Sequence, residues 1–172
     1  MTLVPFRGAS PAVHGTAFVA PTASLIGDVV LGPASSAFYG VTVRADTTPI
    51  RVGVGSNLQD NVVVHADPGF PAVIGDRVSV GHGAVVHGCT IEDDCLVGMG
   101  ATVLNGAVIG TGSLIAAGAV VLEGTVVPPR SLVAGVPAKV RRELTDDEIA
   151  GVRRNAEQYT ALAEEHRRAT TT

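Results

Sequence analysis

The chain has 172 residues and a formal net charge of -4; 46% of its residues are hydrophobic, 3% are aromatic and none is tryptophan. This length allows one domain with its own core, and the acidic balance argues against a general nucleic-acid-binding surface. Two cysteines do not make a disulfide framework and suit a reducing compartment, so a cytoplasmic location is expected. The N-terminus lacks the pattern of a secretory signal, and no run of about 18 apolar residues predicts a membrane span.

A six-residue repeat organises residues 10 to about 137. Aliphatic residues recur every six positions, most of them followed four positions later by a small residue; the longest unbroken series is Ile91, Val97, Val103, Ile109, Ile115, Val121, Val127 and Val133. This period fits neither an α-helix nor a simple alternating strand. It is typical of a solenoid in which each hexapeptide is a short strand plus a turn, and three hexapeptides make one triangular coil. The aliphatic residues are expected to fill the prism.

The sequence after the repeat predicts one C-terminal helix. Thr145 and Glu148 form a capping box, and apolar residues follow at helical spacing from Ile149 to Tyr159 and beyond. We therefore expect a β-helix domain over residues 1–145 and a helix over residues 146–168 packed along the prism. Residues 169–172 are expected to form a frayed tail.

Counting hexapeptides places three polar residues in one column on the prism surface. His65 and His87 take the same place in successive coils, with four extra residues looped out between them in ADPGFPAV. Arg44 takes that place one coil earlier, and Asp46 lies at the turn that follows it. Adjacent parallel strands are about 4.8 Å apart, so the two imidazoles could converge on one metal ion.

A second column lies around a corner of the prism. His82 is third in its hexapeptide, and Asp60, preceded by Gln59, takes that place one coil earlier. Within one chain this column points away from the first. If His65, His82 and His87 form one site, His82 must come from a neighbouring chain, and the metal would lie at an interface. A three-fold assembly would contain three such sites.

Other reactive side chains have simpler interpretations. His14 and His166 are interpreted as solvated surface residues. Cys89 and Cys95 are interpreted as small core residues, because two cysteines alone do not make a zinc site.

Three motifs carry a family resemblance: VRAD at 43–46, LQDNVVVH at 58–65 and GHGAVVHGC at 81–89. Together with the repeat and the terminal helix, they resemble the γ-class carbonic anhydrase family, and most closely its short bacterial branch. The resemblance implies a mainly β fold, a left-handed parallel β-helix with a C-terminal α-helix, assembled as a homotrimer. It implies reversible hydration of CO2 to bicarbonate at zinc, although three histidines also accept iron(II) or cobalt. His65 and His87 would be same-chain ligands and His82 the ligand from the next subunit.

The resemblance also implies roles for six further residues. Arg44, Asp46 and Asp60 correspond to an arginine and two aspartates that form interface ion pairs in the family. Gln59 corresponds to a glutamine that orients the metal-bound water. Asn155 and Tyr159 correspond to an asparagine and a tyrosine that the terminal helix places near the site.

The sequence departs from the family archetype at two places. The archetype has an acidic loop with a proton-shuttling glutamate after its first histidine, whereas the loop here contains only Asp67. Thr47 follows VRAD, where the archetype has a glutamate. A non-catalytic, metal-containing trimeric scaffold is therefore one alternative. A coenzyme-A-dependent acyltransferase, or a related thioesterase, is another, because acyltransferases share the hexapeptide fold and use one histidine as a general base.

Overall fold

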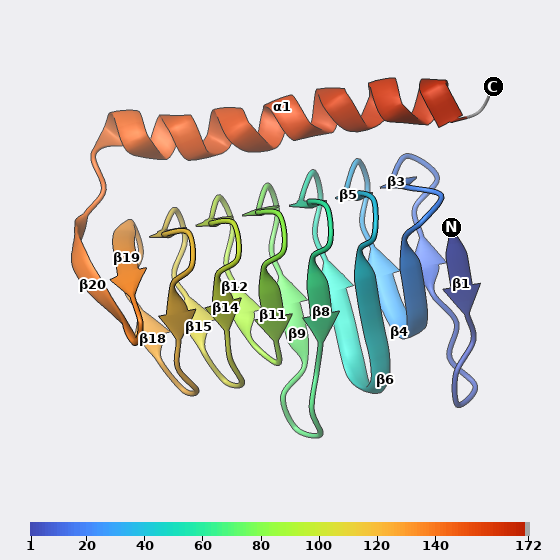
Figure 1. The fold of residues 1–172 in the computed structure, drawn as a ribbon, viewed down its shortest axis with the longest axis horizontal. Helices are drawn as coiled ribbons and strands as arrows, with labels where there is room; N and C mark the ends of the chain where they lie inside the picture. The colour runs from blue at the N-terminus through green and yellow to red at the C-terminus, as the bar shows by residue number, and fades with distance from the viewer. Residues whose placement is uncertain (171–172) are drawn as a thin grey trace.

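The computed structural model describes residues 1–170, which form a solenoid of short parallel strands with one helix along its side (Figure 1). A 12-stranded sheet turns a corner within the long strands β4 (Ser24–Leu31) and β6 (Thr42–Val52), and so makes two faces of the prism. An 8-stranded sheet makes the third face. The predicted solenoid with a C-terminal helix is confirmed.

The remaining strands belong to three faces. The histidine face contains β1 (Thr2–Val4), β8 (Val63–His65), β11 (Val85–His87), β14 (Thr102–Val103) and β17 (Val120–Val121). The second face contains β2 (Ala12–Val13), β9 (Ala72–Ile74), β12 (Thr90–Ile91), β15 (Val108–Ile109) and β18 (Val126–Val127). The helix face contains β3 (Phe18–Val19), β5 (Ser36–Ala37), β7 (Asn57–Leu58), β10 (Ser79–Val80), β13 (Leu96–Val97), β16 (Leu114–Ile115), β19 (Ser131–Gly135) and the antiparallel β20 (Ala138–Glu143).

Aliphatic side chains fill the prism in the predicted phase. Val97 pairs with Ile115, eighteen residues later, so three hexapeptides do make one coil. Each fully buried Leu or Ile contributes about 1.5–3 kcal/mol relative to an exposed one. Cys89 and Cys95 are 1% and 0% exposed, which confirms their interpretation as core residues. The largest fully buried side chains are Leu25, Leu31, Ile50, Leu58, Ile74, Ile91, Ile109 and Ile115.

Helix α1 (Asp146–Thr170) begins where the capping box predicts. The Thr145 N–H donates to Glu148 Oε2 over 2.9 Å, and the Glu148 N–H donates to Thr145 Oγ1 over 3.2 Å. The hydrogen bond from Arg142, followed by that from the Thr145 backbone, lowers the pKa of Glu148 to about 2. The helix extends two residues beyond the expected end, so residues 169 and 170 are helical. The last two residues of the expected tail, 171–172, lie outside the described residues.

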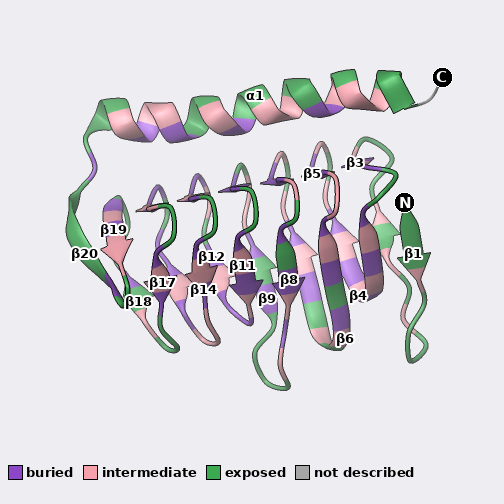
Figure 2. Ribbon diagram, viewed as in Figure 1, coloured by how far each residue is buried: buried purple, intermediate pink, exposed green. Residues whose placement is uncertain are grey.

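One side of α1 packs on the helix face of the prism (Figure 2). Its buried residues are Ile149, Val152, Ala156 and Ala163. Within residues 1–170, no helix combines the length and apolar character that a membrane span needs.

His166 lies near the end of α1 and is not a solvated surface residue, so that interpretation was wrong. Its ring stacks on Phe18 at 6.0 Å between centroids and contacts the Phe38 and Tyr39 rings. The Tyr39 hydroxyl lies 3.0 Å from His166 Nδ1. His14, by contrast, is an exposed turn residue, as predicted.

Close contact between coils predicts which glycines are indispensable. A Cβ on Gly110 would come within 2.6 Å of the Pro129 backbone nitrogen, whereas a Cβ on Gly124 would meet nothing within 4 Å. We expect Gly110→Ala to cost about 3 kcal/mol of unfolding free energy through overpacking. Gly124→Ala should cost about 1 kcal/mol, because only its left-handed backbone disfavours a side chain. Chemical denaturation of both variants measures the difference, and equal losses would contradict the coil-contact argument.

Candidate metal centre

The strand register aligns the first polar column as the hexapeptide count predicts. Arg44 of β6 pairs with His65 of β8, which pairs with His87 of β11. Arg44 donates to Asp46 in a short ion pair. His65 Nε2 lies 3.1 Å from Asp46 Oδ1. Arg44, His65 and His87 come together at the surface because each follows a buried valine in its strand.

The Asp46 carboxylate determines the tautomer of His65. Burial alone would raise the pKa of Asp46, but hydrogen bonds from Arg44 and His65 outweigh it and hold the pKa below its ordinary value of 3.8. An ionised carboxylate only accepts hydrogen bonds, so His65 Nε2 must carry the hydrogen. When the ring carries this one hydrogen, His65 Nδ1 presents a lone pair.

An equivalent arrangement determines the tautomer of His87. His87 Nδ1 lies 2.8 Å from Asn105 Oδ1, and Asn105 Nδ2 donates to Asp67 Oδ2 over 3.0 Å. Because the amide nitrogen faces a carboxylate, the amide oxygen must face the imidazole. His87 Nδ1 therefore carries the hydrogen, and Nε2 presents a lone pair.

These two lone pairs converge. His65 Nδ1 and His87 Nε2 are 2.9 Å apart, and the ring centroids are 4.9 Å apart. Two neutral imidazoles with both outer hydrogens engaged have no hydrogen for this contact, so the two nitrogens are arranged as ligands for a cation. In a tetrahedral zinc site with Zn–N distances of about 2.0–2.1 Å, ligand atoms are about 3.3 Å apart. The pair therefore fits a metal ion after a small opening.

One chain also brings a carboxylate to this pair. Ligand atoms from His65, Asp67 and His87 all lie within 4.8 Å of one another. His82 is not in this cluster, which agrees with the prediction that it belongs to a different column. A single chain thus supplies two of the three predicted histidine ligands, with Asp67 beside them.

The second column lies beside α1. His82 Nδ1 is 2.9 Å from Asp60 Oδ2, so the ring donates there and Nε2 accepts from the Tyr159 hydroxyl at 3.3 Å. Burial, and then the charge of Asp60, raises the pKa of Tyr159 above its ordinary value of 10.0, so it stays a phenol. Gln59 Nε2 donates to Asn57 Oδ1 over 3.2 Å.

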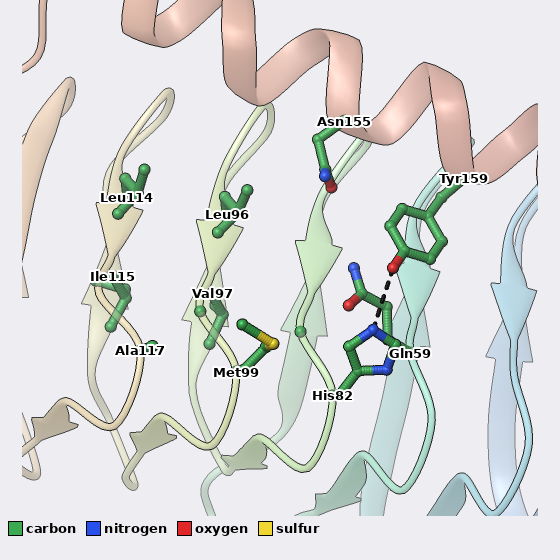
Figure 3. A pocket seen from close by; sticks show the side chains of 12 residues that line it. Gln59, His82, Leu96, Val97, Met99, Leu114, Ile115, Ala117, Asn155 and Tyr159 are labelled. Carbon is green, nitrogen blue, oxygen red and sulfur yellow. Dashed lines mark hydrogen bonds between the residues drawn. The ribbon is translucent and has the colours of Figure 1, made fainter.

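His82 opens into a cavity of about 390 Å³ between the helix face and α1 (Figure 3). Gln59, Asn155 and Tyr159 line its polar end, so both predicted helix residues reach the His82 column. Asn155 Oδ1 is buried and has no hydrogen-bond partner within residues 1–170. The rest of the lining is apolar and includes Leu96, Val97, Met99, Leu114, Ile115 and Ala117.

The structure therefore groups the predicted residues into two half-sites. Arg44, Asp46, His65 and His87 form one, and Gln59, Asp60, His82, Asn155 and Tyr159 form the other. Asn105 was not predicted from the sequence. The coil after His87 is one residue short, so the strand register places Leu104 opposite His87, and a hexapeptide count does not bring Asn105 into the histidine column.

The cysteines take no part in either half-site. Burial raises the pKa of both Cys89 and Cys95 to about 12, so neither forms the thiolate that metal binding or nucleophilic attack requires.

Two relatives are similar over most of the chain. A protein of Methanocaldococcus jannaschii named "Probable carbonic anhydrase" is 58% identical over 146 residues, which cover 85% of this chain and 92% of that relative. The protein "Gamma carbonic anhydrase 2, mitochondrial" of Arabidopsis thaliana is 46% identical over 171 residues, which cover 96% of this chain. The chain spans only 62% of the length of the Arabidopsis protein.

Fold comparisons lead to the same superfamily. The crystal structure of a hexapeptide transferase family protein from Anaplasma phagocytophilum is 43% identical, has a TM-score of 0.92, and covers 95% of this chain and 97% of that one. A family model described as "Bacterial transferase hexapeptide (six repeats)" matches residues 88–123. With the relatives above, these matches show that the chain belongs to the γ carbonic anhydrase-like family of hexapeptide-repeat proteins.

Proposed function

We propose that this protein catalyses the reversible hydration of CO2 to bicarbonate, with a metal ion held by three histidines at each interface of a homotrimer. The observation that carries the proposal is the convergence of the His65 and His87 lone pairs at 2.9 Å. A third imidazole, His82, lies on a different face of the prism, where its Nε2 lone pair accepts from the Tyr159 hydroxyl in the single chain. The three ligands can meet only if neighbouring chains contribute different half-sites. Zinc, iron(II) and cobalt all suit three imidazoles.

Each half-site has a definite role in this reaction. A divalent metal with three neutral imidazole ligands lowers the pKa of a bound water to about 7 and so supplies hydroxide at neutral pH. Asp46 and Asn105 hold the ligand tautomers of His65 and His87. Gln59 lies beside His82, where its amide would orient water or bicarbonate. The apolar part of the cavity would admit CO2 and exclude water.

The two columns continue in a way that supports a parallel trimer. Along the histidine face, the strand register carries the column from His87 to Leu104 and Leu122. Beside the helix, backbone hydrogen bonds between coils show that Met99 and then Ala117 take the place of His82 in the following coils. If His82 lies between His65 and His87 of the next chain, the following coils bring these apolar residues together. Met99 and Leu122 are 59% and 47% exposed in the single chain, which suits a covered interface.

The same alignment also pairs charges. One coil before His82 is Asp60, and one coil before His65 is Arg44. In the proposed trimer Arg44 of one chain faces Asp60 of the next. An ion pair beside an apolar strip would favour one register and one orientation of the subunits.

Acyl transfer and a non-catalytic scaffold are less well supported. The transferase names of the matched family model and of the Anaplasma relative are the observations that favour acyl transfer. The paired histidine lone pairs favour a metal instead.

Stopped-flow CO2 hydration tests the proposed activity. Protein loaded anaerobically with zinc or iron(II) should hydrate CO2 well above the uncatalysed rate, and metal-free protein should not. His82→Ala should lose the activity, because the metal loses one of its three protein ligands. His14→Ala, which changes an exposed turn residue, is the matched control. A fully active His82→Ala variant would refute the three-histidine site, and no turnover by metal-loaded protein would favour the scaffold.

Mixed subunits test the interface location. His82→Ala and His87→Ala chains should each be inactive alone, because every interface lacks one ligand. After unfolding and refolding together in equal amounts, about a quarter of the head-to-tail interfaces should combine His82 with an intact His65–His87 pair. Activity should therefore recover to about a quarter of that of the wild type. No recovery would place all three ligands within one chain.

A charge in the apolar strip tests the assembly. We expect Leu122→Lys to raise the dissociation constant of the trimer by about 100-fold or more, because the interface would bury an unpaired charge. Val126→Lys is the control, since Val126 is 72% exposed and lies on the second face. Sedimentation or light scattering reports the oligomeric state. A Leu122→Lys variant that assembles as well as Val126→Lys would contradict the proposed register.

A further inference from the structure

We infer that Asn105, held in place by Asp67, is a positioning residue that selects the metal-binding nitrogen of His87. This inference deepens the proposed function and rests on its metal site. Asn105 comes from the coil above His87, and Asp67 comes from the loop inserted below it. The three side chains thus form one hydrogen-bonded series across successive coils.

The direction of this series follows from the donors available. Asp67 is a carboxylate acceptor, so the Asn105 NH2 group must point toward it. The Asn105 oxygen then faces His87 Nδ1 at 2.8 Å and requires a hydrogen there. A neutral imidazole has only one N–H, so Nε2 is left as the lone pair that faces His65. Without Asp67, the amide could turn over and favour the opposite tautomer of His87.

The inserted loop and strand β6 both hold the backbone carbonyl of Asp67. The Phe70 N–H donates to the Asp67 carbonyl over 2.9 Å, and the Thr48 hydroxyl donates to the same carbonyl over 3.0 Å. These contacts restrict the backbone that carries the carboxylate. The loop is thus more than a spacer between two coils, because it presents one carboxylate to Asn105.

Phe70 covers one side of the series. A Cβ added to Gly88 would come within 2.9 Å of Phe70 Cβ, and one added to Gly106 within 3.3 Å of Phe70 Cε1. The added Gly88 Cβ would also contact the Asn105 side chain, so Phe70 and Asn105 share this space. Side chains at positions 88 and 106 would displace the ring. Glycine at both positions therefore lets the loop close down beside Asn105.

Groups that hydrogen-bond the outer nitrogen of a metal-ligating histidine change metal affinity by about 10–100-fold. The probe is Zn²⁺ alone, in competition with a chromophoric chelator, on the full-length protein. Asn105→Ala should raise the Zn²⁺ dissociation constant by about 10–100-fold. The visible absorption of the Co²⁺-loaded protein should change as well, because it reports the ligand field and not the stability of the fold.

Exchanging the side chains of positions 67 and 105 distinguishes a positioning role of Asn105 from a general effect on the stability of the fold. Asn105→Asp alone should weaken Zn²⁺ binding, because it replaces the 3.0 Å hydrogen bond to Asp67 by two facing carboxylates. The double variant Asp67→Asn/Asn105→Asp should recover most of the affinity. An amide at position 67 can donate to a carboxylate at position 105, which still accepts from His87.

Thr111→Ala is the matched control. It removes another hydrogen bond between coils, from the Thr111 hydroxyl to Glu92 Oε2 over 2.9 Å, away from the histidines. Its Zn²⁺ affinity should equal that of the wild type. Unchanged affinity in Asn105→Ala, or a double variant no better than Asn105→Asp, would overturn the inference and leave the metal site intact. A wild-type protein that binds no Zn²⁺ would overturn both.

Discussion

The structure depends on one constraint, the parallel pairing of each coil with the next in a constant register. Each strand residue lies beside its equivalent one coil away, as Val97 lies beside Val80 and Ile115. Backbone hydrogen bonds join the coils, as the Gly81 N–H donates to the Val97 carbonyl over 2.8 Å. Adjacent strands in such a sheet are about 4.8 Å apart. Any side chain repeated at one place in successive coils therefore joins a straight surface column. The half-site proposed to bind metal consists of two neighbouring members of such a column, His65 and His87.

The column alone brings two imidazoles together, but it does not decide which nitrogens face each other. That choice is made by acceptors on opposite sides, Asp46 next to His65 and Asn105 next to His87. Each acceptor binds the hydrogen on the outer nitrogen of its imidazole ring. The inner nitrogens, His65 Nδ1 and His87 Nε2, then present lone pairs to each other at 2.9 Å. Two lone pairs that face each other make an unfavourable contact, which a cation between them would relieve. This is the kind of local conflict that proteins keep at functional sites.

The columns, the core phase and the helix start could be predicted from the sequence, because each depends only on spacing along a regular element. Asn105 and the surroundings of His166 could not be predicted in the same way. Asn105 lies at a turn, where the direction of the side chain depends on the inserted loop that supplies Asp67. The contacts of His166 depend on how α1 lies across the prism. Helical spacing indicates that His166 shares a side with Tyr159, seven residues earlier, but not that Phe18 and Phe38 lie beneath it.

The inserted loop also gives a structural reason for the residues that follow VRAD. The Thr47 hydroxyl donates to the Ala66 carbonyl, and the Thr48 hydroxyl donates to the Asp67 carbonyl. A threonine is short enough to bond the adjacent loop backbone, whereas a glutamate at position 47 would carry its charge beyond it. The pair of threonines therefore holds a short loop against β6. The single carboxylate of that loop accepts a hydrogen bond from Asn105, whose amide oxygen in turn lies beside His87.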